Sequence, residues 1–361
     1  MKNKKIKKEI TFFYTDHIEK NTWLNLKKKF KIKGYKTSYS RNLKKKVEIG
    51  FYNHDQNIKN NARFSVATLH GMDQGRTSWP NAWKKTRWDF YDIGLLPGKA
   101  WVKLWKTSSQ NPEANPKKGV FEVGWPKSDN IYSLSFKKKV KEIKKKLNSK
   151  KKTILYAPSF ETDNKQLDIL NLAKKLNLNL VVKHWASKDD RSFSDIYRNI
   201  IKMNKISKKE YKDVYIFPPK SNIFLYLALA DILITDESSV MYEGMLFEVP
   251  TVVPNDWVMR INNTNKPRPI KPSVHAYLNC SIDNLPKKVS WILKNKIKVK
   301  KKINKQKFLH FSNIKYSSNI IVNLIHKVIN NVDLISNIKI KKTKNEHFLM
   351  KFKNYLKNYY V

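Results

Sequence analysis

The chain has 361 residues, of which 74 are lysine or arginine and 29 are aspartate or glutamate, so its formal net charge is +45. This length is sufficient for two domains of ordinary size, and a hydrophobic content of 40% argues against an intrinsically disordered chain. The charge favours anionic partners, which include nucleotides, phosphate polymers, acidic lipids and nucleic acid. The single cysteine, Cys280, excludes an internal disulfide and a cysteine-based zinc cluster, and it indicates a reducing compartment.

The N-terminal part of the chain is predicted to alternate between strands and helices. Runs of β-branched and aromatic residues predict strands at Glu9–Tyr14, Val47–Tyr52 and Phe64–Leu69, and a helix is expected at Asn21–Lys31. The last of these strands leads directly into His70 and Gly71. Ligands of open α/β sheets bind beyond the carboxyl ends of the strands, so His70 is a candidate catalytic residue.

The middle of the chain contains the predicted domain boundary. Residues 95–129 are rich in proline turns and are expected to form loops, whereas residues 136–147 predict a lysine-rich helix. The apolar stripe of this helix is narrow, which favours a solvent-exposed face over a membrane anchor. The polar, basic run over residues 148–152 is a predicted linker. We therefore expect an N-terminal Rossmann-like domain over residues 1–147, a C-terminal one over residues 148–300, and a basic helical tail over residues 301–361.

The second predicted domain repeats the alternation of strands and helices. Strands are expected at the run beginning with Thr153 and at residues 179–182, 214–217 and 232–234, with helices at 167–176 and 223–229. The second of these strands ends in Lys183 and His184. In the tail, residues 294–305 read as a charge-dense connection, followed by predicted helices at 317–330 and 346–359.

The segment from Ala230 to Met245 predicts a strand, a polar turn and a helix. A turn of this kind can bind phosphate, because free backbone N–H groups and the positive end of the helix dipole meet there. Ser238 and Ser239 would add two hydroxyl groups. The alternative interpretation is an ordinary helix N-cap, which any α/β protein can contain.

Five blocks of sequence, in order, resemble motifs of the CDP-glycerol glycerophosphotransferase family, the enzymes of teichoic-acid and related polymer synthesis. They are Leu69-His-Gly71, Val123-Gly-Trp-Pro-Lys-Ser-Asp129, Ile154-Leu-Tyr-Ala-Pro-Ser159, Val182-Lys-His184 and Ile234-Thr-Asp-Glu-Ser-Ser-Val-Met241. The resemblance extends from about Phe64 to about Pro254. Trp185 and Glu161 depart from it, because the family usually has proline and arginine at these positions. The resemblance implies an α/β fold of the GT-B class, with two Rossmann-like domains facing a central cleft.

The resemblance also implies a reaction and the residues that perform it. An acceptor hydroxyl would attack the β-phosphate of a CDP-linked alcohol such as CDP-glycerol, and CMP would leave. His70 is the expected general base, and His184 is the second expected catalytic residue. The expected phosphate ligands are Lys183, Ser238 and Ser239. Asp236 and Glu243 are expected to support the turn or the nucleotide, and Gly71, Arg76, Ser159 and Arg268 to line the substrate cleft. No metal ligand cluster or required cofactor is expected, although a magnesium ion on the pyrophosphate is compatible with this chemistry.

Two other function classes compete with this interpretation. A GT-B glycosyltransferase would use a nucleotide sugar in capsule or lipopolysaccharide synthesis and would share most of the phosphate site. A nucleic-acid or polyanion-binding protein would explain the charge, but the sequence contains no recognised nucleic-acid motif, so no specific nucleic-acid partner is expected. The longest apolar run, residues 223–234, is shorter than the roughly 20 residues of a membrane span. We expect a cytoplasmic protein bound peripherally to the anionic inner face of the membrane, where a lipid-linked or polymeric acceptor is available.

Overall fold

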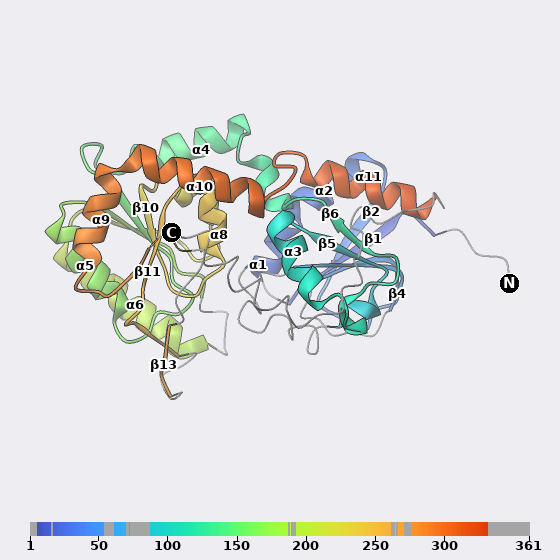
Figure 1. The fold of residues 1–361 in the computed structure, drawn as a ribbon, viewed down its shortest axis with the longest axis horizontal. Helices are drawn as coiled ribbons and strands as arrows, with labels where there is room; N and C mark the ends of the chain where they lie inside the picture. The colour runs from blue at the N-terminus through green and yellow to red at the C-terminus, as the bar shows by residue number, and fades with distance from the viewer. Residues whose placement is uncertain are drawn as a thin grey trace. The chain divides into compact units, whose positions relative to one another are not determined.

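The structure is a computed structural model of the chain, and it divides into two compact units. It describes residues 6–15, 17–53, 61–69, 72, 87–186, 188, 193–260, 264, 266–270, 276 and 278–330. Among the described residues, the first unit consists of those up to Tyr132 together with residues 308–330. The second unit runs from Ser133 to Lys307 (Figure 1). The chain therefore returns to its first unit after completing the second.

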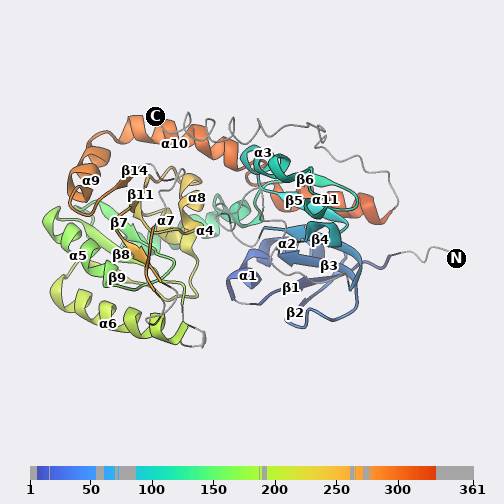
Figure 2. The same cartoon turned by 60° about the horizontal axis from the view of Figure 1, so that its bottom comes forward.

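A six-stranded parallel sheet forms the centre of the first unit (Figure 2). Its spatial order is β2 (Lys36–Ser40), β1 (Glu9–Phe13), β3 (Val47–Asn53), β4 (Ala62–Thr68), β5 (Ile93–Leu96) and β6 (Val120–Glu122). The helices of this unit are α1 (His17–Thr22), α2 (Leu24–Ile32), α3 (Lys99–Ser108) and α11 (Ser317–Ile329). The strands expected near residues 9, 47 and 64 are thus confirmed, and the helix expected at 21–31 is divided between α1 and α2.

Helix α11 is an integral part of the first unit. Ile321 and Ile325 are buried in the same apolar cluster as Phe12 and Phe51 of the sheet. Figure 1 shows α11 beside α2, with which it makes its most extensive helix contact. The expected separate tail over residues 301–361 is therefore corrected for residues 308–330, because burial of the apolar face of α11 requires the first sheet. The helix expected at 346–359 lies outside the described residues.

The block Val123–Asp129 anchors the start of α11. The carboxylate of Asp129 accepts hydrogen bonds from the backbone N–H of Ser317 (3.0 Å) and of Ser318 (2.7 Å). Gly124 has a φ of +94°, and a Cβ at this position would lie 2.3 Å from Oγ of Ser317. The glycine thus permits both a left-handed turn and close approach of α11. One of the five blocks that carried the family resemblance therefore has a structural task within the first unit.

A second six-stranded parallel sheet forms the centre of the second unit. Its spatial order is β14 (Leu278–Cys280), β11 (Thr251–Pro254), β10 (Ile232–Ile234), β7 (Thr153–Tyr156), β8 (Asn179–Val182) and β9 (Val214–Ile216). The helices of this unit are α4 (Leu134–Lys144), α5 (Lys165–Lys175), α6 (Ser194–Glu210), α7 (Ile223–Leu227), α8 (Val240–Met245) and α9 (Leu285–Lys294), joined by most of α10 (Lys296–His310). A short antiparallel pair, β12 (Val258–Met259) and β13 (Arg268–Pro269), lies outside the sheet.

Several expected boundaries differ from the structure. The proline-rich region that was expected to be loop contains β5, α3 and β6, because strongly apolar residues such as Trp101 and Trp105 are buried there. The predicted first boundary at residue 147 moves to residue 132, since Phe136 of α4 stacks on Phe247 of the second unit at 6.1 Å. The expected connection at 294–305 is mostly helix α10, whose residues Val299 and Ile303 are buried one turn apart.

None of the described helices is long and apolar enough to cross a membrane.

Candidate functional site

The second sheet has its topological switch point between β7 and β10. From β7 the chain proceeds outward to β8 and β9, then returns to the other side of β7 for β10, β11 and β14. Open parallel sheets bind ligands beyond the carboxyl ends of the strands at such a point. The residues that follow β7, β8 and β10 therefore define the candidate site. They include the sequence-predicted Ser159, Lys183, His184, Asp236, Ser238 and Ser239.

Asp236 organises the two loops at the switch point. Its carboxylate accepts hydrogen bonds from the backbone N–H of Ser159 at 2.6 Å and of Phe160 at 3.3 Å. Its Oδ2 atom also lies 3.2 Å from Nζ of Lys165, and both side chains are almost completely buried. A buried ion pair of this kind requires additional hydrogen bonds to offset the loss of hydration, and the two N–H groups supply them. Asp236 thus joins the loop after β7 to the loop after β10.

The two serines of the turn after β10 differ in their hydrogen bonding. The Ser238 hydroxyl accepts a bond from the backbone N–H of Val240 at 3.4 Å, which makes it a local cap of α8. The Ser239 hydroxyl has no hydrogen-bond partner in the described part of the chain, and this residue is partly exposed. Ser159 donates its hydroxyl hydrogen to the carbonyl oxygen of Glu237 at 3.1 Å. Both serines of the turn therefore keep a hydroxyl hydrogen that can be donated to a ligand, and the oxygen of Ser239 also lacks a partner in the described part of the chain.

Lys183 and His184 follow β8 and are both buried. Nζ of Lys183 donates to the carbonyl oxygens of His184 (2.8 Å) and Pro219 (2.6 Å). Burial, assisted by the positive charges of Lys183 and Lys165, lowers the pKa of His184 to about 3. The imidazole is consequently neutral at physiological pH.

Gln166 determines which nitrogen of His184 carries the hydrogen. The Gln166 side-chain N–H groups donate to Asn204 Oδ1 at 3.2 Å and to Ser207 Oγ at 2.8 Å. The amide oxygen of Gln166 therefore faces Nε2 of His184, from which it lies 2.8 Å. An amide oxygen only accepts hydrogen bonds, so Nε2 is the donor and Nδ1 keeps its lone pair. Within the described residues Nδ1 has no hydrogen-bond partner.

Glu161 and Tyr156 form a buried polar pair beneath this arrangement. The Tyr156 hydroxyl donates to Glu161 Oε2 at 2.6 Å, and the backbone N–H of Gln166 donates to Oε1 at 3.2 Å. Burial raises the pKa of Glu161 to about 7, although these hydrogen bonds and the charge of Lys165 oppose the shift. Glu161 is one of the two departures from the family pattern, and its carboxylate accepts a hydrogen bond from the first turn of α5.

Two arginines of the segment after β11 reach the loops of the site. Arg268 forms two hydrogen bonds of 2.8 Å with the carboxylate of Glu237, which belongs to the turn after β10. Arg260 pairs with Asp163 of the loop after β7, with Nε at 2.9 Å from Oδ2. The guanidinium group of Arg268 therefore lies at the turn after β10, where the carboxylate of Glu237 balances its charge. Glu243 is buried in α8.

His70, Gly71 and Arg76 lie outside the described residues. Strand β4, which ends at Thr68, leads toward them as the sequence predicted. In the described part of the chain, no group of three or more histidine, cysteine, aspartate or glutamate side chains could hold a metal ion.

The sequence reasoning did not identify Lys165, Gln166 or Tyr156 as parts of the site. Lys165 and Gln166 begin a helix whose other buried residues are apolar, so two buried polar residues in its first turn are the signal that was available. Their partners, Asp236 and His184, lie 71 and 18 residues away along the chain. Only the parallel pairing of β7 with β8 and β10 brings these groups together.

Comparison with known proteins gives the following relationships. Residues 84–258 match the family described as CDP-Glycerol:Poly(glycerophosphate) glycerophosphotransferase. Structures of the wall teichoic acid polymerase TagF are similar, one at 17% identity over 90% of this chain and 89% of that chain with a TM-score of 0.58. A TagF variant soaked with CDPG has 16% identity, the same coverage and a TM-score of 0.59.

A second group of solved structures shares the architecture. UDP-GlcNAc 2-epimerase from Neisseria meningitidis, bound to UDP-GlcNAc, matches at 14% identity over 88% of this chain and 100% of that chain, with a TM-score of 0.58. The S. aureus MnaA-UDP structure matches at 12% identity over 92% and 100%, with a TM-score of 0.59. None of the curated proteins matches this chain in sequence. At these identities the structural similarities establish the fold class.

Proposed function

We propose that this chain is a CDP-glycerol glycerophosphotransferase-like enzyme, which transfers glycerol phosphate from CDP-glycerol to a hydroxyl group of a lipid-linked or polymeric acceptor. The acceptor oxygen attacks the β-phosphorus, the bond from this phosphorus to the bridging oxygen breaks, and CMP leaves. The observation that supports the proposal is that Ser159, His184 and Ser239 each follow the carboxyl end of a strand at or next to the switch point of the second sheet. This location is where parallel sheets bind nucleotides.

The donor phosphates would bind at the turn after β10. The Ser239 hydroxyl can donate to a phosphate oxygen, and the short helix α8 begins at the next residue with its dipole directed favourably. The Ser238 oxygen would hold the turn by accepting from Val240, while its hydroxyl hydrogen can still be donated to a phosphate oxygen. Lys183 would add positive potential from a buried position while its ammonium group remains bonded to two carbonyl oxygens. Asp236 would orient the turn, and Glu243 would support the nucleotide.

His184 would act in the reaction as a neutral imidazole. Its Nε2–H bond to Gln166 leaves Nδ1 as a hydrogen-bond acceptor directed away from that bond. Such a nitrogen can orient a hydroxyl group of the donor or receive a proton when an anion lies beside it, since nearby negative charge raises the pKa of an imidazole. His70 remains the proposed general base for the acceptor hydroxyl, with Gly71 and Arg76 beside it in the sequence and Arg268 as a further contact.

The reaction is tested by measuring nucleotide release from a panel of donors. Purified protein is incubated with CDP-glycerol, CDP-ribitol, UDP-sugars or CMP-sugars and a mixture of lipid-phosphate acceptors. We expect CMP from CDP-glycerol, and we expect His70→Ala to reduce this release by 10²-fold or more while leaving donor binding almost unchanged. CMP release by the variant within a few-fold of the parent would show that His70 is not the base.

A nucleotide-sugar donor is the second candidate, and the architectural similarity to UDP-GlcNAc 2-epimerase favours including it. A glycosyltransferase would use the same switch point for its donor diphosphate. If UDP is released from a UDP-sugar and no CMP is released from CDP-glycerol, the chain is a glycosyltransferase.

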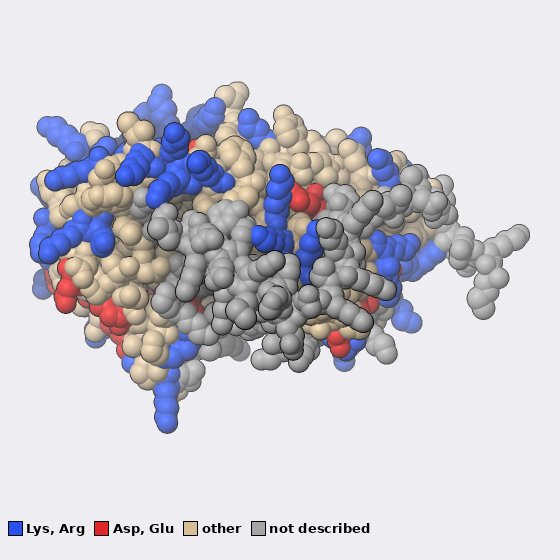
Figure 3. Space-filling model, in the orientation of Figure 1, with Lys and Arg blue, Asp and Glu red and all other residues tan. Residues whose placement is uncertain are grey.

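The acceptor is expected to lie at an anionic membrane surface on the cytoplasmic side. Basic side chains gather over the region of α9 and α10 (Figure 3). Lysines near anionic lipid contribute about 1 kcal/mol each to binding, so peripheral attachment needs only a few of them. The protein should sediment with vesicles that contain phosphatidylglycerol and remain soluble with phosphatidylcholine vesicles, and salt should reverse the binding. Equal sedimentation with both vesicle types would contradict an electrostatic attachment.

A further inference from the structure

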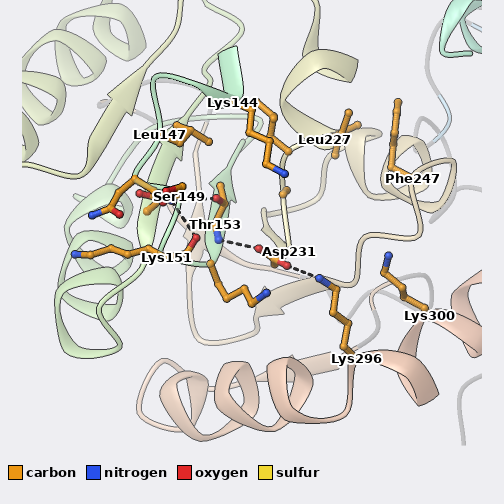
Figure 4. A pocket seen from close by; sticks show the side chains of 16 residues that line it. Lys144, Leu147, Ser149, Lys151, Thr153, Leu227, Asp231, Phe247, Lys296 and Lys300 are labelled. Carbon is orange, nitrogen blue, oxygen red and sulfur yellow. Dashed lines mark hydrogen bonds and ion pairs between the residues drawn. The ribbon is translucent and has the colours of Figure 1, made fainter. Parts of the chain in front are cut away.

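The second unit contains a pocket of about 380 Å³ at the edge of its sheet opposite the candidate site. Its lining includes Thr153 and Asn179, the first residues of β7 and β8, and Asp231, which directly precedes β10 (Figure 4). The candidate site follows the last residues of the same three strands. Because β7 spans four residues at about 3.3 Å each, the two places are separated by at least the length of the strand. The pocket is therefore distinct from the donor site.

The lining of the pocket is strongly basic. Five lysines contribute to it, namely Lys144, Lys151, Lys152, Lys296 and Lys300, against one carboxylate, Asp231. Two of the lysines are neutralised locally, because Lys296 pairs with Asp231 and Lys151 pairs with Asp213, each at 2.6 Å. In the described part of the chain, the other three have no carboxylate partner. These three come from the end of α4, the residue before β7 and the second turn of α10.

The three unpaired lysines reach the hollow from the protein surface, since Lys144 and Lys152 are exposed and Lys300 is partly exposed, and together they give it a positive potential that attracts anions. An apolar wall formed by Leu147, Leu227 and Phe247 lies on one side of the hollow (Figure 4). Figure 4 shows the Lys144 side chain extending into the space between this wall and Asp231. The pocket therefore combines positive charge with a surface suited to carbon groups.

We propose that this pocket is a second anion-binding site, which takes the phosphate group of an organic phosphate ester. Lysine ammonium groups bind phosphate as point charges from several directions, which suits three side chains that originate from different elements. The volume is sufficient for a phosphate with a small organic substituent, and the apolar wall would contact that substituent. The ester can come from a lipid headgroup or from a soluble phosphate, since both present the same chemistry.

Site-resolved lysine modification of the full chain tests the proposal. The protein is treated with an amine-reactive reagent at constant ionic strength, with and without saturating glycerol 3-phosphate, and each lysine is followed by mass spectrometry. Modification of Lys144, Lys152 and Lys300 should slow at least fivefold, whereas the exposed Lys202, Lys205 and Lys209 of α6 should change less than twofold. Because the readout is specific to each lysine, binding at the donor site cannot produce this pattern.

A parallel arm replaces the soluble ester with vesicles of phosphatidylglycerol or of phosphatidylcholine. Protection of the three pocket lysines by phosphatidylglycerol vesicles identifies a lipid headgroup as the ligand, and protection only by glycerol 3-phosphate identifies a soluble ester. Either result supports the site. Equal slowing of pocket and α6 lysines in both arms, or no slowing in either, would overturn the proposal.

A matched pair of variants provides an independent check. The triple variant K144Q/K152Q/K300Q should bind glycerol 3-phosphate at the pocket at least tenfold more weakly than the parent. The control K202Q/K205Q/K209Q removes the same charge from α6 and should differ from the parent by less than twofold. Thermal unfolding of both variants establishes that they fold. Similar weakening in the two variants would show that general charge, rather than this pocket, binds the anion.

Discussion

Nε2 of His184 lies 2.8 Å from the amide oxygen of Gln166, so a side chain from the first turn of α5 orients the imidazole that follows β8. Gln166 is itself held by hydrogen bonds to Asn204 and Ser207 of α6. This chain of contacts connects the candidate site to two helices that do not form its surface. His184 is thus held in one tautomer by a fixed neighbour, which is the arrangement that preorganises a catalytic imidazole.

Replacement of Gln166 tests this role as a positioning residue. Gln166→Leu removes the hydrogen bond to His184, and we expect kcat for CMP release to fall about tenfold or more, with a smaller effect on KM. Gln166→Glu keeps the acceptor but adds negative charge, which raises the pKa of His184. If the reaction uses the neutral imidazole, the rate of this variant should fall at the acidic end of the pH profile. A profile identical to that of the parent would contradict the positioning role.

Removal of the buried carboxylate of Asp236 should be strongly destabilising. Asp236→Asn leaves the ammonium group of Lys165 buried without a charged partner, and loss of one member of a buried pair costs about 3 to 5 kcal/mol. The control is Asp163→Asn, which breaks the more exposed pair with Arg260 and should cost at most about 1 kcal/mol. Urea unfolding at neutral pH measures both values. Equal losses of stability in the two variants would mean that the pair of Asp236 and Lys165 does not hold together the loops after β7 and β10.

The pKa of Glu161 makes the stability of the chain depend on pH. The folded state holds a proton on Glu161 up to about pH 7, whereas the unfolded chain releases it near 4.5, so the folded state binds more protons between these values. The free energy of unfolding should therefore decrease as pH rises through this window, by roughly 3 kcal/mol in total. Glu161→Gln resembles the protonated acid and should remove most of this slope. Urea titrations at pH 5 and pH 8 distinguish the parent from the variant.

The N-terminal cap of α11 should contribute measurably to the stability of the first unit. Asp129→Ala leaves the N–H groups of Ser317 and Ser318 without their acceptor and should reduce the free energy of unfolding by about 1 to 2 kcal/mol. The matched control is Ser133→Ala, which removes the N-cap of α4. The Ser133 hydroxyl accepts a hydrogen bond from the backbone N–H of Phe136 at 3.2 Å, and its loss should lower the free energy of unfolding by about 1 kcal/mol or less. Proteolysis near residue 330 should accelerate only in the Asp129 variant. Unchanged stability would show that apolar packing alone holds α11.

Ser239 should affect donor binding without affecting stability. Its hydroxyl has no partner among the described residues, so Ser239→Ala removes no internal hydrogen bond. A hydrogen bond to a charged phosphate contributes about 1.5 to 3 kcal/mol, which predicts at least a tenfold increase in the Kd for CDP-glycerol. Ser221→Ala, which removes a surface hydroxyl bonded to Pro218, is the control and should leave the Kd unchanged. Calorimetric titration measures both.

Much of the second unit could be predicted from the sequence because its strands are short, mostly apolar runs that stop at polar residues. The strands at Thr153, Asn179, Val214 and Ile232 are examples, and Ser159, His184 and Ser239 were identified because they follow such runs. The helices α3 and α10 were missed, since proline-rich and lysine-rich composition concealed their apolar faces. Composition describes average polarity, whereas a helix needs only a few apolar residues on one face to pack.

The sequence by itself determined the alternation of strands and helices, the family resemblance and the polar residues at strand ends, because these depend on neighbours along the chain. Only the tertiary structure decided that Asp236 pairs with Lys165, that Gln166 orients His184 and that α11 completes the first unit. It also decided that lysines from α4 and α10 line one pocket with the start of β7. These relationships join residues far apart in sequence, and they depend on sheet order and on the burial of apolar faces, which bring charges and hydrogen-bonding groups together in space.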